Sequence, residues 1–179
     1  MVAEHNGTQV IVYVHYDPAR PAGQSTRLYY TIDSGTGFSA PAPVHAEARA
    51  DFNPRLAFLA DGRLLAVFES SKLGQLALTT GERVSGLEVA WSIYDPTTDS
   101  WSAPTLLSDN DYLDHAPRLA PSPLGAMVVW QSNAGNEVIA TPTSPTQLHY
   151  ATWNGSGFSA PAELPATIQP EGESDLAFD

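Results

Sequence analysis

Short runs of apolar residues recur along the chain and are separated by polar turns. Three of these runs, Gln9 to Tyr16, Leu64 to Ser70 and Met127 to Ser132, are rich in β-branched and aromatic residues. Runs of this length between glycine-containing turns are typical of β-strands, and Asp61-Gly62 is a hairpin turn signal. No segment keeps a helical period of apolar residues. The pattern therefore predicts an all-β protein.

A tetrapeptide of one aromatic residue followed by Ser-Ala-Pro occurs three times, beginning at Phe38, Trp101 and Phe158. A second motif begins 16 residues after each aromatic residue: PRLA at 54–57 and 117–120, and SDLA at 174–177. Three gapless matches at one offset indicate an internal repeat. We expect the aromatic residue of each copy to fill the space between neighbouring units.

Each unit contains four apolar segments, and the units span approximately residues 6–61, 62–124 and 125–179. Four short strands per unit fit one blade of a β-propeller, a ring of small sheets that cover one another's faces. We therefore expect residues 1–179 to form one unit of three four-stranded blades.

The phase of the repeat suggests how such a ring could close. The chain begins with the second strand of one blade and ends with the innermost strand of another. Since propellers have about 4 to 8 blades, we expect two copies to form a six-bladed ring as a homodimer. Residues 174–179 of the partner chain would then supply the innermost strand of the first blade. The alternative is that the chain belongs to a longer propeller.

Charge and composition narrow the classes of partner. The chain has 20 Asp and Glu against 8 Lys and Arg, a net charge of −12, so its surface repels nucleic acid and anionic membranes. It has no cysteine, which excludes disulfides and thiolate metal sites. No apolar run reaches the ~18 residues of a membrane span, so we expect no membrane insertion. The N-terminus lacks a signal peptide. We therefore expect a cytoplasmic protein, or an extracellular or cell-surface one if the chain is a mature or excised form.

The turn and last strand of each unit resemble segments of known propeller families. YDPTTDSWSAP at 94–104 is similar to a kelch blade, without the kelch double glycine. DSGTGFSAP at 33–41 and WNGSGFSAP at 153–161 resemble the Asp-box turns of sialidase-like propellers. ATWNGSGFSAP at 151–161 also resembles the blades of fucose-lectin propellers. The lectin resemblance implies a propeller assembled from short chains.

An acidic residue follows each aromatic anchor by thirteen positions: Asp51, Asp114 and Glu171. In a propeller the segment before the innermost strand opens at the mouth of the central channel, so the three acids would surround it. A ring of carboxylates there would bind a cation or sugar hydroxyls. The alternative is a framework role, in which each side chain accepts hydrogen bonds from nearby backbone N–H groups.

The segment before the second innermost strand, which begins at the PRLA motif of 117–120, holds several aspartates. Asp109, Asp111 and Asp114 lie close together in it, and hard cations bind several oxygen ligands from one flexible segment. The run lacks the glycine and final glutamate of an EF-hand loop, and the other units do not repeat it. Calcium is therefore a candidate cofactor, and a solvated acidic loop is the alternative.

The loops between the second and third strands of each blade are long and differ most between units. Variable loops on a constant framework are where binding specificity usually lies. His15, Glu69 and Gln131 stand near the ends of the second strands, beside these loops. We expect these three residues to line the rim of a ligand pocket.

Motifs of known enzymes are incomplete in this chain. FNPRLAFLADGRLLAVFES at 52–70 resembles the segment with which sialidases begin, but aligned on Pro54 the family's arginine falls on Phe52. Arg55 points to the other face of a strand. The five histidines have no zinc spacing, and no nucleophile elbow or phosphate-binding loop occurs.

These observations favour a non-catalytic module that binds carbohydrate or a protein at the channel mouth and beside the long loops. We expect no cofactor apart from the candidate calcium. The alternatives are a sialidase-like glycoside hydrolase, whose paired carboxylates would lie about 5 to 9 Å apart, and a structural piece of a larger propeller.

Overall fold

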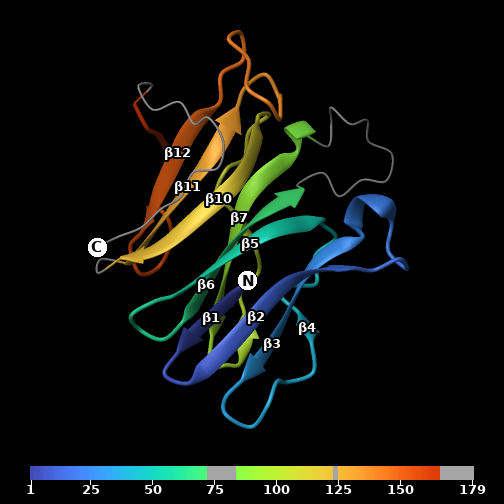
Figure 1. Cartoon of the computed structure of the whole chain (residues 1–179), viewed down its shortest axis with the longest axis vertical. Coiled ribbons are helices and arrows are strands. Elements are labelled where there is room, and N and C mark those ends of the chain that lie inside the picture. The colour runs from blue at the N-terminus through green and yellow to red at the C-terminus, as the bar shows by residue number, and fades with distance from the viewer. Residues whose placement is uncertain (72–83, 123–124, 166–179) are drawn as a thin grey trace.

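The computed structural model describes residues 1–71, 84–122 and 125–165, which form three antiparallel β-sheets (Figure 1). The first sheet contains β1 (Val2–His5), β2 (Thr8–Tyr16), β3 (Thr26–Asp33) and β4 (Ala42–Pro43), with the short 3-10 helix η1 (Ala22–Gln24) before β3. The middle sheet contains β5 (Asp51–Phe58), β6 (Leu64–Ser71), β7 (Leu87–Asp95) and β8 (Ser100–Trp101), and β9 (Thr105–Leu106) also pairs with β7. The third sheet contains β10 (Leu113–Ser122), β11 (Gly125–Asn133), β12 (Gln147–Trp153) and β13 (Ala162–Glu163). No helix in these segments is long and apolar enough to cross a membrane.

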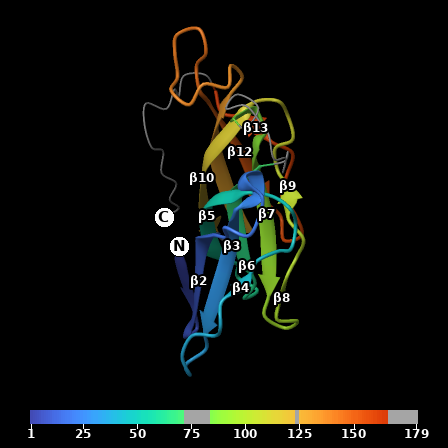
Figure 2. The ribbon, with the colours of Figure 1, turned by 90° about the vertical axis from the view of Figure 1, so that its right-hand side faces the viewer.

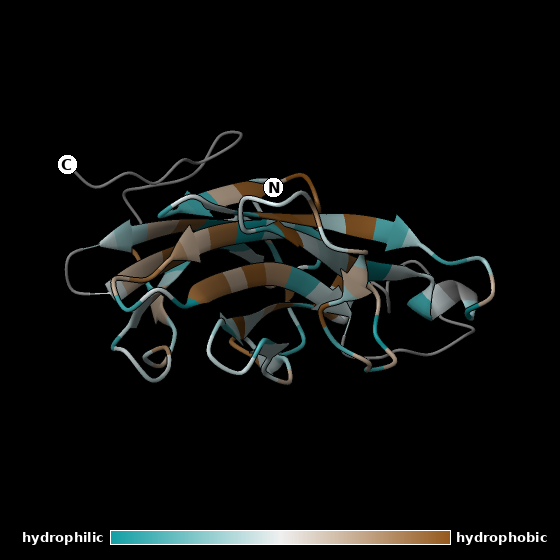
Figure 3. Ribbon diagram, turned by 90° about the horizontal axis from the view of Figure 1, so that it is seen from below, coloured by the Kyte–Doolittle hydropathy of each residue, from teal (hydrophilic) through white to brown (hydrophobic). Residues whose placement is uncertain are grey.

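The sheets pack side by side, with the middle sheet between the other two (Figure 1). From the side, β2, β5 and β10 lie toward one edge of the molecule, and the short strands β8, β9 and β13 lie toward the opposite edge (Figure 2). Hydrophobic residues are concentrated in the strands, and hydrophilic residues colour most of the connecting loops (Figure 3). The prediction of an all-β fold is confirmed, and the three sheets match the predicted four-stranded blades, with β9 as a fifth strand in the middle sheet.

The second and third strands of each sheet pair in the same register. Val12 faces Tyr30 in the first sheet, Val67 faces Trp91 in the middle sheet, and Val129 faces Tyr150 in the third. The repeat in the sequence therefore places equivalent residues at equivalent points of each sheet. This equivalence makes it possible to compare the surroundings of one residue across all three sheets.

The first sheet differs from our expectation at its inner edge. We expected residues 174–179 of a partner chain beside β2, but β1 of the same chain pairs there. The turn between β1 and β2 is Asn6-Gly7, with φ of 50° and 81°, and a type I′ hairpin turn requires positive φ at both positions. Residues 174–179 lie outside the described residues, and the homodimer and the six-bladed ring remain predictions.

Each serine of the Ser-Ala-Pro motif joins its segment to the preceding long strand. Ser39 accepts a hydrogen bond through Oγ from the Ile32 N–H at 3.1 Å and donates its own N–H to the Ile32 carbonyl at 2.8 Å. Ser102 and Ser159 make the same pair of bonds with the equivalent residues of β7 and β12. Because these serines serve local structure, the motif is framework rather than a site.

Two apolar cores fill the spaces between the sheets. The first core joins the first and middle sheets around Val12, Leu28 and Phe68, and the second joins the middle and third sheets around Val67 and Trp130. Figure 3 shows the corresponding hydrophobic stretches along the strands. Residues at the strand ends, beyond these cores, form the walls of a pocket.

Candidate functional site

A pocket of about 510 Å³ opens where the ends of β2, β5, β6, β7 and β10 converge. Its walls include Tyr16, Phe52, Leu87 and Leu113. Among the described residues that line the pocket, Glu69 is the only one with a carboxylate side chain. Pockets of this size with mostly apolar walls and a few polar groups are typical of small-molecule sites.

Two β-bulges shape the wall of this pocket. In β5 and in β10 the pairing with the neighbouring strand shifts, and one residue of each bulge has a left-handed backbone: Asn53 (φ 53°) and Ala116 (φ 54°). A left-handed backbone is uncommon for residues other than glycine and often occurs at functional sites. The residues just before the two bulges, Phe52 and His115, both line the pocket.

The Glu69 carboxylate is held by both bulges. Its Oε1 atom accepts a hydrogen bond from Asn53 Nδ2 at 2.9 Å and another from the backbone N–H of Ala116 at 2.7 Å. The first donor belongs to the same sheet and the second to the neighbouring sheet. Glu69 is 8% exposed, so its carboxylate is almost buried but still reaches the pocket.

His115 lies on the same pocket wall. Burial lowers the pKa of its imidazole below the usual value of 6.5, although the Glu69 and Asp114 carboxylates act in the opposite direction. Its Nε2 atom is buried and has no hydrogen-bond partner among the described residues. The lowered pKa favours a neutral ring at neutral pH, which can donate one hydrogen bond and accept another.

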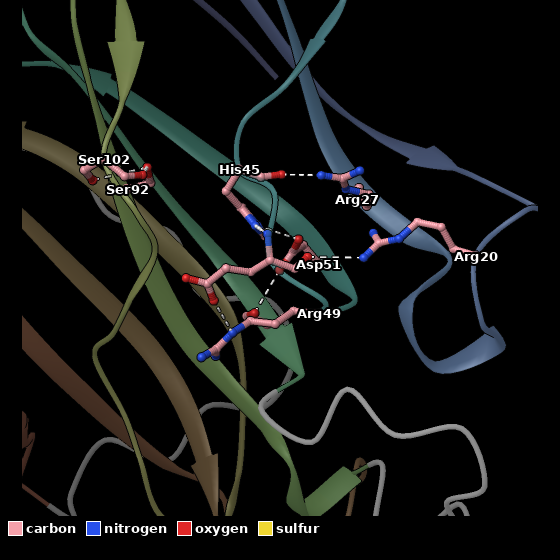
Figure 4. A network of polar contacts seen from close by, with 9 residues as sticks. Arg20, Arg27, His45, Arg49, Asp51, Ser92 and Ser102 are labelled. Atoms are coloured by element: carbon pink, nitrogen blue, oxygen red, sulfur yellow. Dashed lines mark hydrogen bonds and ion pairs between the residues drawn. The ribbon is translucent and has the colours of Figure 1, made fainter.

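Asp51 belongs to a buried network behind the pocket (Figure 4). Its Oδ1 atom accepts a hydrogen bond from the Ser70 hydroxyl at 2.8 Å, and its Oδ2 atom lies 2.8 Å from His45 Nε2. The backbone N–H of Glu47 donates to His45 Nδ1 at 3.2 Å, so the proton of the neutral ring lies on Nε2 and is donated to Asp51. Arg27 contacts the His45 carbonyl and fixes this segment to the first sheet.

The order of these groups excludes a serine nucleophile at this place. In a catalytic triad the imidazole stands between serine and carboxylate and takes the serine proton. Here the Asp51 carboxylate stands between Ser70 and His45. The network therefore stabilises the start of β5.

Asp114 occupies the equivalent place at the start of β10 and is also fully buried. Its Oδ1 atom accepts a hydrogen bond from Trp130 Nε1 at 2.9 Å, and its Oδ2 atom accepts one from Asn110 Nδ2 at 2.8 Å. Neither Asp51 nor Asp114 lines the pocket. Since all four of their oxygens accept hydrogen bonds inside the protein, this geometry favours the framework alternative over a ring of ligand-binding acids.

The other predicted rim residues are not brought together. Of the three predicted rim residues, Glu69 is the one that lines the pocket. His15 is exposed and its ring lies 4.7 Å from the ring of Tyr29, while Gln131 is half-buried and faces His115 across β10 and β11. Glu171 lies outside the described residues.

The acidic segment before β10 is largely exposed. Asp109 and Asp111 are exposed, and the Asp111 carbonyl accepts a hydrogen bond from Asn136 Nδ2 at 3.0 Å. The described residues include no group of three His, Cys, Asp or Glu side chains that could hold a metal ion. Calcium therefore stays an untested prediction.

Sequence reasoning missed Phe52, His115 and the two bulge residues. A signal was present, because the pentapeptides DFNPR at 51–55 and DHAPR at 114–118 share three of five letters. Proline within a strand is confined to edges, first positions and bulges, so this repeated proline indicated a bulge at the start of each inner strand.

No protein-family model matches this sequence, and no curated protein matches it. Solved structures do match its fold. A thermostable family-43 glycoside hydrolase superposes with a TM-score of 0.60 at 10% identity, over 92% of this chain and 53% of its own. An α-L-arabinofuranosidase from Lactobacillus brevis gives 0.55 at 16%, over 88% and 53%. An endo-arabinase from Bacteroides thetaiotaomicron gives 0.52 at 11%, over 97% and 75%.

These comparisons correct two predictions. They support a propeller-like fold, but through glycoside hydrolases rather than kelch, sialidase-like or fucose-lectin proteins. The predicted non-catalytic binding module is contradicted, because the matching structures are named as glycoside hydrolases, which was the alternative. The chain spans about half the length of the first of these structures.

Proposed function

We propose that this chain takes part in the hydrolysis of a glycosidic bond and that Glu69 is a carboxylate of the reaction. The observation that supports this most directly is the position of Glu69, an almost buried carboxylate that is fixed by two donors and opens into a pocket. The fold shared with glycoside hydrolases agrees with the proposal.

The chemistry needs one carboxyl group to protonate the leaving oxygen and a second to activate water or to attack the sugar. Among the described residues, both hydrogen bonds to Glu69 go to Oε1. Any proton that this group gives or takes is therefore on Oε2. The apolar wall excludes water around the sugar ring, which strengthens electrostatic interactions inside the pocket.

The second carboxyl group is not among the described residues of the lining. Asp51 and Asp114 already use both of their oxygens. The second group thus comes from residues outside the described part or from a neighbouring chain, in agreement with the half-length match to the glycoside hydrolases.

Two of the similar structures are named for arabinan or arabinofuranoside cleavage, so we expect an α-L-arabinofuranosyl linkage. The test is release of nitrophenol from an aryl α-L-arabinofuranoside, and of sugar from arabinan, by the full chain. Glu69→Gln should lower kcat/KM by about 10²- to 10⁴-fold. Glu163→Gln, in the outer strand β13, is the matched control and should keep full activity.

The anomeric form of the first product then gives the class of mechanism, since retention means that one of the two carboxylates is a nucleophile and inversion that one is a general base. Equal activity of Glu69→Gln and the wild type would contradict the proposal. So would the absence of any sugar release by the wild-type chain.

A further inference from the structure

Large exposed apolar side chains gather around the pocket. Tyr16, Phe52 and Val138 line it and are 64%, 36% and 66% exposed, respectively. They come from β2, from β5 and from the loop between β11 and β12, so the tertiary structure brings them to one place. A single exposed apolar side chain needs no explanation, whereas several that meet at one cavity mark a surface that binds a ligand.

Phe52 lies directly beside the Glu69 carboxylate. The two residues are cross-strand partners in β5 and β6, just before the bulge of β5. Residues paired in this way point to the same face of a sheet, with Cβ atoms about 4.5–5.5 Å apart. Tyr16 and Thr26 are partners of the same kind in β2 and β3, and both line the pocket. A group bound next to the Glu69 carboxylate therefore meets the Phe52 ring.

Val138 stands on a loop whose base is fixed by one fully buried side chain, that of Asn133. The Oδ1 atom of Asn133 accepts hydrogen bonds from the backbone N–H groups of Gly135 at 3.0 Å and Glu137 at 3.1 Å. It also accepts one from the Ser144 hydroxyl at 2.8 Å, on the returning side of the loop. The segment directly before Val138 therefore has a fixed path, and this path holds an apolar side chain at the pocket.

The lining carries little charge. Among the described residues that line the pocket, Glu69 has the only carboxylate, and none is a lysine or an arginine. A carboxylate or phosphate group on the ligand would lie near Glu69 without a cation to offset the repulsion. The net charge of −12 on the whole chain acts in the same direction. The pocket thus favours a neutral ligand.

The wall suits one sugar unit better than two. Each sugar hydroxyl loses hydrogen bonds to water when it enters the pocket, and this costs free energy unless the protein replaces those bonds. The described lining offers hydroxyl side chains at Ser25, Thr26 and Ser71, and most of the remaining wall is apolar. An aromatic ring needs no hydrogen bonds and packs favourably against the rings of Tyr16 and Phe52. The part of the ligand outside the first sugar is therefore better matched by an aromatic group than by a second sugar.

We propose that this pocket takes a neutral glycoside with an aromatic aglycone, whose ring lies among Tyr16, Phe52 and Val138 while the sugar lies toward Glu69. The proposal rests on the glycoside hydrolysis proposed above and names the substrate class of the same site. Water is added across the glycosidic bond, and the aglycone leaves as an alcohol or phenol that carries the proton. A volume of about 510 Å³ is in the range of pockets that hold ligands of more than one ring.

The test compares three α-L-arabinofuranosides that differ in the leaving group: benzyl, methyl, and a second arabinose in α-1,5-linked arabinobiose. All three release an unactivated alcohol, so differences in rate report how the leaving part is bound. The full chain should hydrolyse the benzyl glycoside with a kcat/KM about 10- to 100-fold above those of the other two. Phe52→Ala, Tyr16→Ala and Val138→Ala should each lower the ratio of benzyl to methyl by about three- to tenfold.

Each of these variants has a matched control of the same kind of side chain. Phe38, Tyr112 and Ile139 are exposed, and none of them lines the pocket. Phe38→Ala, Tyr112→Ala and Ile139→Ala should therefore keep the wild-type ratio of benzyl to methyl. A ratio that falls equally in the control variants would contradict the assignment of the aglycone to this wall.

Calorimetry gives a second readout that does not depend on turnover. Glu69→Gln should bind the benzyl glycoside about 10- to 100-fold more tightly than the methyl glycoside, and adding Phe52→Ala should remove most of that difference. Tight binding of the benzyl glycoside without hydrolysis by the wild type would support this proposal and overturn the proposed reaction. Hydrolysis of all three glycosides at one kcat/KM, or a preference for arabinobiose, would overturn this proposal and leave the reaction standing. Neither binding nor hydrolysis would overturn both.

Discussion

The sharpest stability prediction concerns Asp51, whose two oxygens tie the segment before β5 to β6. Its Oδ1 and Oδ2 accept one hydrogen bond each, from Ser70 and from His45, and the carboxylate is fully buried. A buried hydrogen bond to a charged group contributes about 1.5–3 kcal/mol. Asp51→Ala removes both bonds and leaves two buried donors, so we expect a loss of about 3–6 kcal/mol in the free energy of unfolding.

The measurement is urea unfolding followed by tryptophan fluorescence, with thermal unfolding as a second readout. For a chain of this size each kcal/mol lowers Tm by about 2–4 °C, so Asp51→Ala should unfold roughly 6–24 °C below the wild type. Asp51→Asn keeps one acceptor, and its loss should therefore be about half as large.

Asp61→Ala is the control for removing an aspartate. Asp61 forms an ion pair with Arg63 at 2.6 Å, but its side chain is 50% exposed. Exposed pairs of this kind contribute about 0–1 kcal/mol. If Asp51→Ala changes stability as little as Asp61→Ala does, Asp51 is not a framework residue and our interpretation of the buried network is wrong.

Three further predictions concern single residues. Because the pKa of His115 is lowered in the folded state, its contribution to stability is complete above pH 6.5 and decreases as the pH falls below that value. The free energy of unfolding of His115→Gln should therefore fall less at acid pH than that of the wild type, as measured by urea unfolding at several pH values. Gly125→Ala should destabilise by about 3 kcal/mol, because the new Cβ would lie 2.2 Å from the Trp153 carbonyl oxygen at a φ of 139°, and a lowered Tm by calorimetry would show it. Trp130→Phe removes the donor to Asp114 Oδ1 and should cost about 1.5–3 kcal/mol in chemical unfolding, while an unchanged midpoint would contradict that role.

Much of the fold could be predicted because it depends on local patterns. Alternating apolar residues and turn signals predicted the long strands. The repeat predicted which strand of one sheet corresponds to which strand of the next. One local signal was overlooked: Asn6-Gly7 forms the hairpin that turns residues 2–5 into β1. The predicted strand exchange depended on that omission.

The candidate site was predicted less well, for a physical reason. The repeat drew attention to Asp51 and Asp114. A residue that recurs in every unit can recur because every unit needs the same structural hydrogen bonds, and this is the role that both aspartates have. Glu69 is the residue that differs between units, since Val14 and Gln131 stand at its equivalent positions. The three sheets therefore do not need one particular side chain at this position, and in the middle sheet the residue there is a carboxylate that lines the pocket.

The sequence by itself determined the strands, their register and the alternation of faces, because each depends on residues that are neighbours along the chain or across a tight turn. Only the tertiary structure decided which carboxylates are used internally and which reaches a pocket. Glu69 meets the backbone of Ala116, 47 residues away on another sheet, through a bulge that turns that N–H toward it. Such a contact depends on how two sheets pack and on one local distortion of a strand, and the spacing of apolar residues along the chain predicts neither.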